Sequence, residues 1–255
     1  MGRGADFALS ARIASVARIA RDFLLPAACP ACDRLLDDGD AGVVCGRCWA
    51  RLDRLRYPQC ERCGHPGRVT PCAWCELLPP YVRAVRSVCW MHRGPGAAIV
   101  HALKYRGWHA IADGMAEQMA RASWPVDVIE ERAAILPVPL AKSRLRERGF
   151  NQSERLASAL ARRWRVPVRN VLVRKRATAT QTRLTPEQRL ANVSGAFCVD
   201  PATRPSIKDS HLVLVDDVVT TAATLNACAA ALMAGGARIV SYVTFGRAPA
   251  QGDRL

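Results

Sequence analysis

Two neighbouring aspartates followed by a threonine-rich loop have the residue types that bind a sugar phosphate. Asp216 and Asp217 follow the apolar run 211–215, and adjacent carboxylates are costly to bury without partners. We therefore expect the strand to end at residue 215 and its acids to face solvent or the hydroxyls of a ribose. The loop 220–224 then leads into a helix, where amide groups and the helix dipole attract a phosphate. The candidate ligand-binding residues are Asp216, Asp217, Thr220, Thr221, Ala222, Ala223 and Thr224.

Eight cysteines form four Cys-x-x-Cys pairs, a spacing that suits a metal ion. The pairs are Cys29 with Cys32, Cys45 with Cys48, Cys60 with Cys63, and Cys72 with Cys75. Two such pairs complete a tetrahedral four-sulfur site, so four pairs predict two sites. The simplest wiring is sequential, with one ion on the first four cysteines and one on the second four, and a crossed arrangement is the alternative. Four thiolates leave no position for water, so both sites should be structural.

Zinc is the expected metal, because two pairs separated by a short gap are typical of structural zinc. Disulfide bonds and four-thiolate iron–sulfur ligation are the alternatives. Disulfides do not explain the strict pairing, and nothing in the sequence directs the chain out of a reducing cytosol. Cys89, Cys198 and Cys228 lie outside the pattern in apolar surroundings, and we expect them to be buried free thiols.

The elements that position these residues follow the pattern of an α/β fold with a parallel sheet. From about residue 81, short β-branched segments alternate with longer alanine- and leucine-rich segments. We expect strands at 82–90, 133–138, 168–173, 196–199, 211–215 and 237–245, and helices at 96–105, 110–122, 151–164 and 222–234. Ligands bind beyond the carboxyl ends of parallel strands, so the loops after Val138, Val173 and Val215 are the expected site. The sequence contains neither a Gly-x-Gly-x-x-Gly motif nor a Walker-type phosphate loop.

Several consecutive segments resemble the ComF family, and they cover nearly the whole chain. They are Phe23-Leu24-Leu25-Pro26, Leu103-Lys104-Tyr105-Arg106-Gly107, Pro137-Val138-Pro139, Arg148-Gly149-Phe150-Asn151-Gln152 and Thr180-Gln181-Thr182-Arg183-Leu184, with Arg189, Asn192, Val193 and Phe197. Taken alone, Asp217 suits a turn and a threonine suits a helix N-cap. Together, segment 211–225 resembles the phosphoribosyl-pyrophosphate motif of type I phosphoribosyltransferases.

The resemblance implies a type I phosphoribosyltransferase-like domain with helices on both faces of its sheet, at residues 81–255. Residues 1–80 would form an N-terminal helix and a small double zinc-binding domain. By similarity, Asp216 and Asp217 would hold the ribose hydroxyls of phosphoribosyl pyrophosphate, which binds with magnesium, and residues 220–224 would hold its 5-phosphate. The loop after Val138 would lie on the pyrophosphate side, and residues 174–194 would form a mobile loop over the site.

One position departs from the family pattern. The family usually has glycine where this chain has Ala222, in a turn whose backbone must approach a phosphate closely. Alanine disfavours a positive φ by about 1 kcal/mol or more. Our hypothesis is that Ala222 is nevertheless compatible with phosphate binding.

A concentration of basic side chains also needs an explanation. The formal net charge is +15, and residues 141–190 hold 14 basic and three acidic side chains. A solvated basic surface and a phosphate or nucleic-acid surface are the two interpretations. For Lys104 an ordinary role at a helix end is the alternative to a ligand role. The candidate phosphate or nucleic-acid contacts are Lys104, Arg148, Gln152, Arg176, Gln181, Arg183 and Arg189.

The family resemblance implies a nucleic-acid-handling protein of DNA uptake that binds single-stranded DNA, with a competence helicase as a further partner. Phe150, Trp164 or Trp108 would then stack on bases. An active phosphoribosyltransferase of nucleotide metabolism or salvage is the first alternative, although no nucleobase-recognition segment or general base is evident. A non-catalytic sensor of the phosphosugar is the second alternative.

We expect a cytoplasmic protein. No apolar run approaches the roughly 18–20 residues that cross a bilayer, and arginines interrupt the apolar N-terminal stretch. The helical stripe from Leu9 to Phe23 is expected to pack against the protein itself, with a membrane-surface helix or a targeting peptide as the alternatives.

Overall fold

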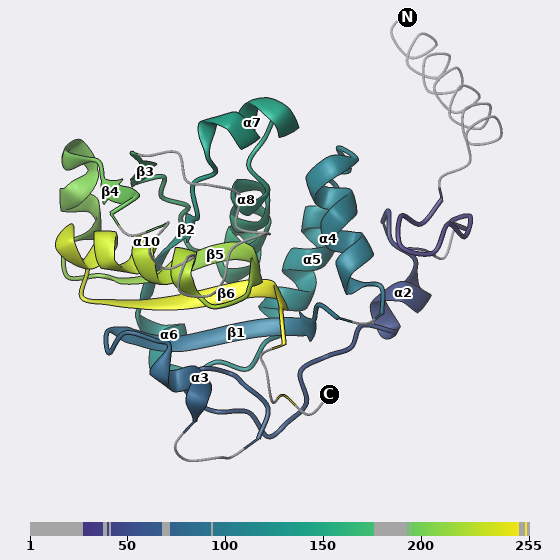
Figure 1. Ribbon diagram of the computed structural model, residues 1–255, viewed down its shortest axis with the longest axis horizontal. Helices are drawn as coiled ribbons and strands as arrows, with labels where there is room; N and C mark the ends of the chain where they lie inside the picture. The colour runs from purple at the N-terminus through teal and green to yellow at the C-terminus, as the bar shows by residue number, and fades with distance from the viewer. Residues whose placement is uncertain are drawn as a thin grey trace, which may run out of the picture.

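The centre of the molecule is a four-stranded parallel sheet. The computed structural model describes residues 28–37, 40, 42–67, 72–92, 94–175, 193, 195–249 and 253. The sheet has the order β1-β6-β5-β2 (Figure 1). Its strands are β1 (Val82–Trp90), β2 (Arg132–Pro137), β5 (His211–Val219) and β6 (Ile239–Arg247). A separate antiparallel pair joins β3 (Leu172–Arg174) and β4 (Phe197–Val199).

Helices cover both faces of the sheet, as the sequence predicted (Figure 1). Helices α4 (Gly96–Tyr105), α5 (Ile111–Ala120) and α8 (Gln152–Trp164) share one hydrophobic cluster with Val213 and Val215 of β5. Helix α10 (Ala223–Ala234) and the β3–β4 pair share the other cluster with Leu212 and Leu214. Successive side chains of a strand point to opposite faces, so an uninterrupted apolar run fills both layers.

Most of the expected elements are confirmed to within a few residues. The expected strand 168–173 is an exception, because the structure has only β3 there, paired with β4 outside the parallel sheet, so the loop after Val173 does not follow a strand of that sheet. The short helices α6 (Val126–Glu131) and α7 (Lys142–Arg148) and the 3-10 helix η2 (Pro201–Ile207) were not predicted. Helix α7 has no buried residue, so it lacks the apolar stripe by which a helix is recognised in a sequence. It ends at Gly149, whose φ of 77° is a conformation that glycine adopts without a steric penalty.

The expected end of β5 at residue 215 is wrong. The strand continues to Val219, with Asp216 opposite Thr244 and Val219 opposite Arg247 of β6. Because β6 extends equally far, it supplies main-chain partners for the extra residues. The acid pair therefore lies within the last four residues of a paired strand.

The cysteine-rich segment packs onto the sheet instead of forming a separate core. It contains the short helices α2 (Gly46–Ala50) and α3 (Ala73–Glu76). Cys48 and Leu52 belong to the hydrophobic cluster on the α4–α5–α8 face. Cys63 and Trp74 belong to the cluster on the α10 face. The segment is thus attached to both layers of the larger part.

Two expectations concern the N-terminal stretch and membranes. The helical stripe from Leu9 to Phe23 and the motif Phe23-Leu24-Leu25-Pro26 lie outside the described residues. Within the described ranges, no helix combines the length and apolar character needed to cross a bilayer.

Candidate functional site

A cavity of about 350 Å³ opens at the carboxyl end of β5, where a parallel sheet binds its ligands. Both acids of the pair line it, together with the loop that follows them. The lining residues are Met91, Val100, Lys104, Asp216, Asp217, Val218, Val219, Thr220, Ala222, Ala223, Thr224 and Leu225. The structure thus brings most of the predicted phosphosugar residues together around one space.

Thr221 is the exception among the predicted loop residues, because it does not line the cavity. Its hydroxyl is buried and has no hydrogen-bond partner in the part of the chain that the structure describes. Thr220, by contrast, is exposed at the mouth of the loop. Thr220 and Thr224 of the loop line the cavity.

Asp217 is almost completely buried, with 4% of its surface exposed, and it is compensated by side chains from two helices. The ammonium group of Lys104 on α4 forms an ion pair with its Oδ2 atom. The Nε2 atom of Gln152 on α8 donates to its Oδ1 atom at 3.4 Å. A buried carboxylate without such partners would be strongly unfavourable, so α4 and α8 make this position possible.

Asp216 is held by hydroxyl and amide donors and has no cation of its own in the described structure. The hydroxyl of Ser153 donates to its Oδ1 atom at 2.8 Å, and the amide of Asp217 donates to the same atom at 2.9 Å. Burial, followed by the charge of Asp217, raises the pKa of Asp216 to about 7. Asp216 can therefore gain or lose a proton near neutral pH.

Lys104 lies at a helix end, as one interpretation of the sequence had it, and its side chain also lines the cavity. It lies in the last turn of α4, and its side chain is 21% exposed. Burial is the largest effect and opposes its charged form, but the charge and hydrogen bond of Asp217 together with the charge of Asp216 outweigh it and raise the pKa of Lys104. The site therefore holds one fixed positive charge beside two carboxyl groups.

The loop after the acid pair contains an alanine in a left-handed conformation. Ala222 has φ 58° and ψ 4° and precedes the first turn of α10. The sequence left open whether this residue would use ordinary dihedrals, and it does not. The first residues of this 12-residue helix line the cavity, and an anion at the amino end of a helix is stabilised by the helix dipole.

A chain of hydrogen bonds links the acid pair to the surface. Arg148 donates from Nη1 to Oε1 of Gln152 at 3.0 Å and from Nη2 to the hydroxyl of Tyr105 at 3.1 Å. Gln152 in turn contacts Asp217. Three of the predicted basic or polar contacts, Lys104, Arg148 and Gln152, thus meet at the site.

The other four predicted contacts lie outside the described residues. These are Arg176, Gln181, Arg183 and Arg189, and most of the segment 174–194 that was expected to close over the site lies there as well. Their roles stay predictions.

None of the three aromatic side chains expected to stack on bases is fully exposed. Phe150 is 8% exposed and packs edge-on against His109, so its selection was wrong. Trp164 packs against Trp124, and Trp108 is partly buried against the core. Which aromatic side chains face outward depends on the tertiary packing, and residue type alone does not reveal it.

Two contributors escaped the sequence analysis. Ser153, which holds Asp216, follows directly on the family segment 148–152, and its position next to Gln152 was the available signal. Asn151 caps α8 by accepting from the amide of Ser153 at 3.0 Å, and its Nδ2 atom donates to the carbonyl of Val138 at 3.0 Å. Asn151 therefore fixes the start of α8 against the end of the β2 loop, which positions Gln152 and Ser153 under the acids.

The eight paired cysteines form two clusters, each with its four sulfur atoms within 4.8 Å of one another. The first contains Cys29, Cys32, Cys45 and Cys48, and the second contains Cys60, Cys63, Cys72 and Cys75. The expected sequential grouping is therefore confirmed, and all eleven cysteines are free of disulfide bonds.

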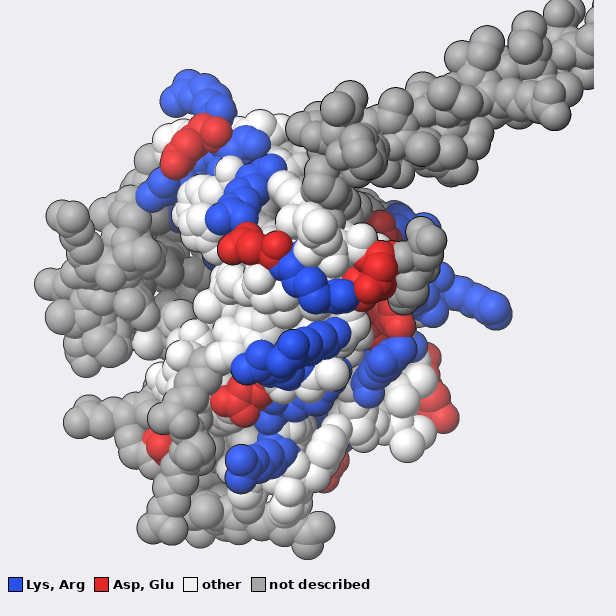
Figure 2. All heavy atoms as spheres, turned by 90° about the vertical axis from the view of Figure 1, so that its right-hand side faces the viewer, with Lys and Arg blue, Asp and Glu red and all other residues white. Residues whose placement is uncertain are grey.

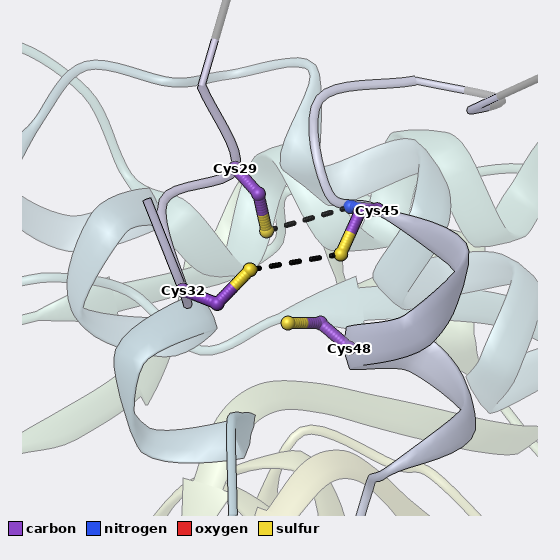
Figure 3. Close-up of side chains that lie close together, drawn as sticks. All are labelled: Cys29, Cys32, Cys45 and Cys48. Atoms are coloured by element: carbon purple, nitrogen blue, oxygen red, sulfur yellow. Dashed lines mark hydrogen bonds between the residues drawn. The ribbon is translucent and has the colours of Figure 1, made fainter. Parts of the chain in front are cut away.

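The geometry of both clusters fits a tetrahedral four-sulfur metal site. Figure 3 shows the four side chains of the first cluster turned toward a common centre. Zinc–sulfur bonds of about 2.3 Å place tetrahedral sulfurs about 3.8 Å apart. The Cys32 and Cys45 sulfurs are 3.8 Å apart, and the Cys60 and Cys75 sulfurs are 3.5 Å apart. Bound there, a zinc ion would be held by thiolates alone and would act as a structural cross-link.

Backbone amides add to the first cluster. The amide of Cys45 donates to the sulfur of Cys29 at 3.4 Å (Figure 3). Burial raises the pKa of Cys45, but hydrogen bonds from the amide and side chain of Cys48 and from the thiols of Cys29 and Cys32 outweigh it and lower the pKa to about 7. Such donors favour the thiolate, which is the form that binds metal.

Comparison with known proteins agrees with this division of the chain. The phosphoribosyl transferase domain family matches residues 151–254, which include the acid pair. The double zinc ribbon domain family matches residues 20–79, which include both cysteine clusters. Zinc is therefore the metal that the clusters suggest.

Similar proteins are found among bacterial DNA utilization and competence proteins. The DNA utilization protein YhgH of Salmonella typhimurium is 34% identical over 209 residues, which cover 77% of this chain and 87% of that protein. The competence protein ComFC of Bacillus subtilis is 28% identical over 200 residues, which cover 76% of this chain and 79% of that protein.

Among solved structures, a glutamine phosphoribosylpyrophosphate amidotransferase from B. subtilis aligns with 53% of this chain and 26% of its own, at 18% identity and a TM-score of 0.37. The fold is assigned from the order of the parallel sheet and from the two family matches.

The grouping of the cysteines can be tested by counting zinc in purified variants. We expect two zinc ions per chain in the unmodified protein and one in the double variant Cys32→Ser with Cys45→Ser, because both changes fall in one cluster. The double variant Cys32→Ser with Cys60→Ser should bind none. Elemental analysis by mass spectrometry gives the counts, and one zinc retained in the second variant would indicate crossed wiring.

The Lys104–Asp217 ion pair should contribute strongly to stability. Replacing Lys104 with methionine leaves a buried carboxylate without its cation, which we expect to lower the free energy of unfolding by about 2–4 kcal/mol. Asp217→Asn in the same background should recover part of this loss, because the uncompensated charge is then removed. Urea denaturation of the two single variants and the double variant measures the coupling, and strictly additive losses would contradict it.

The conformation of Ala222 predicts an unusual response to glycine. Relief of the positive φ, worth about 1–2 kcal/mol, should offset the flexibility that glycine adds to the unfolded chain, so Ala222→Gly should leave stability within about 0.5 kcal/mol or raise it. Ala230→Gly, at an exposed position inside α10, is the matched control and should cost about 1 kcal/mol. Equal losses in the two variants, measured by urea denaturation, would mean that Ala222 is not strained.

Proposed function

Because this chain belongs to the ComF family, we propose that it binds phosphoribosyl pyrophosphate in the cavity beside Asp216 and Asp217 and handles single-stranded DNA in DNA uptake. The observation that carries the ligand proposal is the meeting of two carboxyl groups and the amino end of α10 on one cavity of about 350 Å³. Carboxylates accept hydrogen bonds from a ribose diol, and a helix amino end attracts the 5-phosphate. The two halves of the ligand are thus matched by two different halves of the site.

Magnesium fits the same site chemically. Carboxylate oxygens together with substrate phosphates are the ligands that this ion prefers. Asp216 and Asp217 supply the carboxylates at the cavity, and Lys104 compensates one of them. When bound with the ligand, magnesium would neutralise the diphosphate, while Ser153 and Gln152 keep the two acids in position.

The DNA part of the proposal rests on charge and on the names of the relatives. The net charge of +15 favours a polyanionic partner, and the relatives are named for DNA utilization and competence. On the face shown in Figure 2, basic side chains occur in several groups with acidic side chains between them. We therefore propose contact with a flexible single strand, which can follow separate basic groups, in preference to a rigid duplex.

One observation favours transfer chemistry as a second function. Asp216 lines the cavity with a pKa raised to about 7, which is the range that suits a general base at neutral pH. An acceptor amine or base would lose its proton to such a group as diphosphate leaves. Release of diphosphate with any of a panel of bases and amines would establish this activity.

The ligand proposal is tested by titration calorimetry with phosphoribosyl pyrophosphate and magnesium. We expect the unmodified chain to bind, and the double variant Asp216→Asn with Asp217→Asn to bind at least tenfold more weakly, because the ribose hydroxyls lose their charged acceptors. The matched control is Glu130→Gln with Glu131→Gln. These two acids are also adjacent in the sequence, but they are exposed on α6 and do not line the cavity. Equal affinity of the Asp216 and Asp217 variant and the unmodified chain would contradict the proposal.

A further inference from the structure

Helix α7 and the end of α4 form a basic and aromatic surface beside the cavity, which we call the α7–α4 surface. Helix α7 has no buried residue and carries four basic side chains, Lys142, Arg144, Arg146 and Arg148, against one acid, Glu147. Most helices are held in place by an apolar face that packs on the core, and α7 has no such face. The basic composition of α7 therefore needs a reason other than packing.

The aromatic part of this surface is a cluster of three side chains centred on Tyr105. The guanidinium of Arg148 lies over the ring of Tyr105, 4.8 Å from its centroid. The ring of His101, one helical turn earlier on α4, lies 4.9 Å from the Tyr105 ring and is tilted by 42° to it. Tyr105 is 52% exposed although both neighbours contact it, and His101 is exposed as well. The cluster therefore leaves aromatic surface of Tyr105 and His101 open to solvent.

This arrangement suits the bases of a single strand. Bases stack on aromatic rings and on arginine planes without regard to sequence, while basic side chains beside the stack neutralise phosphates. A protein partner would be expected to need an apolar groove, and the one large apolar side chain that is exposed on α7 is Leu145. A surface with separated cations and exposed aromatic rings is better matched by nucleic acid.

The α7–α4 surface is also connected to the phosphosugar cavity. Tyr105 follows Lys104, the cavity lysine, in the sequence. Arg148 reaches Asp217 through a single intervening side chain, Gln152. The α7–α4 surface is therefore connected to the cavity in two ways, through the neighbouring residues Tyr105 and Lys104 and through the hydrogen bonds from Arg148 to Gln152 to Asp217.

We infer that the α7–α4 surface is the binding site for single-stranded DNA, whose bases stack against Tyr105, Arg148 and His101 while Lys142 and Arg146 of α7 contact its phosphates; Arg144 is paired with Glu147. This inference rests on the proposed function, which it deepens by naming the residues. It also replaces the buried Phe150 with the exposed Tyr105 as the principal stacking residue.

The chain offers a matched control for Tyr105. Tyr57 is 67% exposed, and it lines a separate cavity of about 430 Å³ with Trp124, Val126 and Asp127. It has neighbouring arginines, Arg83 and Arg86, so its chemical setting is comparable. A general loss of an exposed tyrosine would affect both positions equally, whereas the proposed site predicts an effect at Tyr105 alone.

The test measures the affinity of the full chain for a labelled oligothymidylate of about 15 nucleotides by fluorescence anisotropy, at several salt concentrations. We expect Tyr105→Ala to weaken binding at least about fivefold, because one base loses its stacking partner. The slope of log affinity against log salt should not change, because no charge is removed. Tyr105→Phe should retain binding, and Tyr57→Ala should match the unmodified chain. Arg146→Gln should lower the salt slope by about 0.7, the value for one phosphate contact on a single strand.

The outcomes separate this inference from the proposed function. Binding by the unmodified chain with equal affinities for Tyr105→Ala and Tyr57→Ala would overturn the inference and leave the proposed function standing. Absence of binding by the unmodified chain would overturn both the inference and the DNA part of the proposed function. Calorimetry of Tyr105→Ala with phosphoribosyl pyrophosphate should show unchanged affinity, and a large loss there would place Tyr105 in the cavity instead.

Discussion

The rest of the site depends on one electrostatic constraint. Two adjacent carboxyl groups lie near the carboxyl end of β5, a central strand of the buried sheet. Neither Asp216 nor Asp217 can lie there unless the surrounding elements compensate them. Helix α4 supplies the cation of Lys104, and α8 supplies the donors of Gln152 and Ser153. The positions of two helices that are distant in sequence are thus tied to one pair of residues.

The cysteine-rich segment has no hydrophobic core of its own, and its thiolates also need compensating charge. It shares its hydrophobic clusters with the sheet, so the metal sites take the place of a core of its own. Two arginines, one partly and one completely buried, anchor the second cluster through carbonyl groups. Arg62 donates to the carbonyls of Val82, Cys75, Leu78 and Pro79, and the completely buried Arg247 of β6 donates to that of Cys63. Positive charge thereby lies next to sulfurs that carry negative charge when a metal is bound.

How much of this could be predicted depends on whether the signal is local. Apolar periodicity located the main strands and helices, and the Cys-x-x-Cys spacing located both clusters, because each pattern is contained in a few neighbouring residues. The extension of β5 to Val219 depends on β6, and the pairing of Lys104 with Asp217 joins residues more than a hundred positions apart. Phe150 was selected by its type, but packing turns it inward and leaves Tyr105 outside. Those features arise only when distant segments meet.

The charges of the site also explain why the pKa of one acid is raised. Lys104 pairs with Asp217 and contacts no oxygen of Asp216 within the described structure, where the groups that donate to Asp216 are the Ser153 hydroxyl and the Asp217 amide. Burial and the neighbouring carboxylate raise the pKa of Asp216, and they outweigh the opposing charge of Lys104. A cation that entered with a phosphosugar would favour the ionised form, since it would add to the positive charge of Lys104. The partial compensation of the acid pair is therefore consistent with a site that is electrostatically complete only when its ligand is bound.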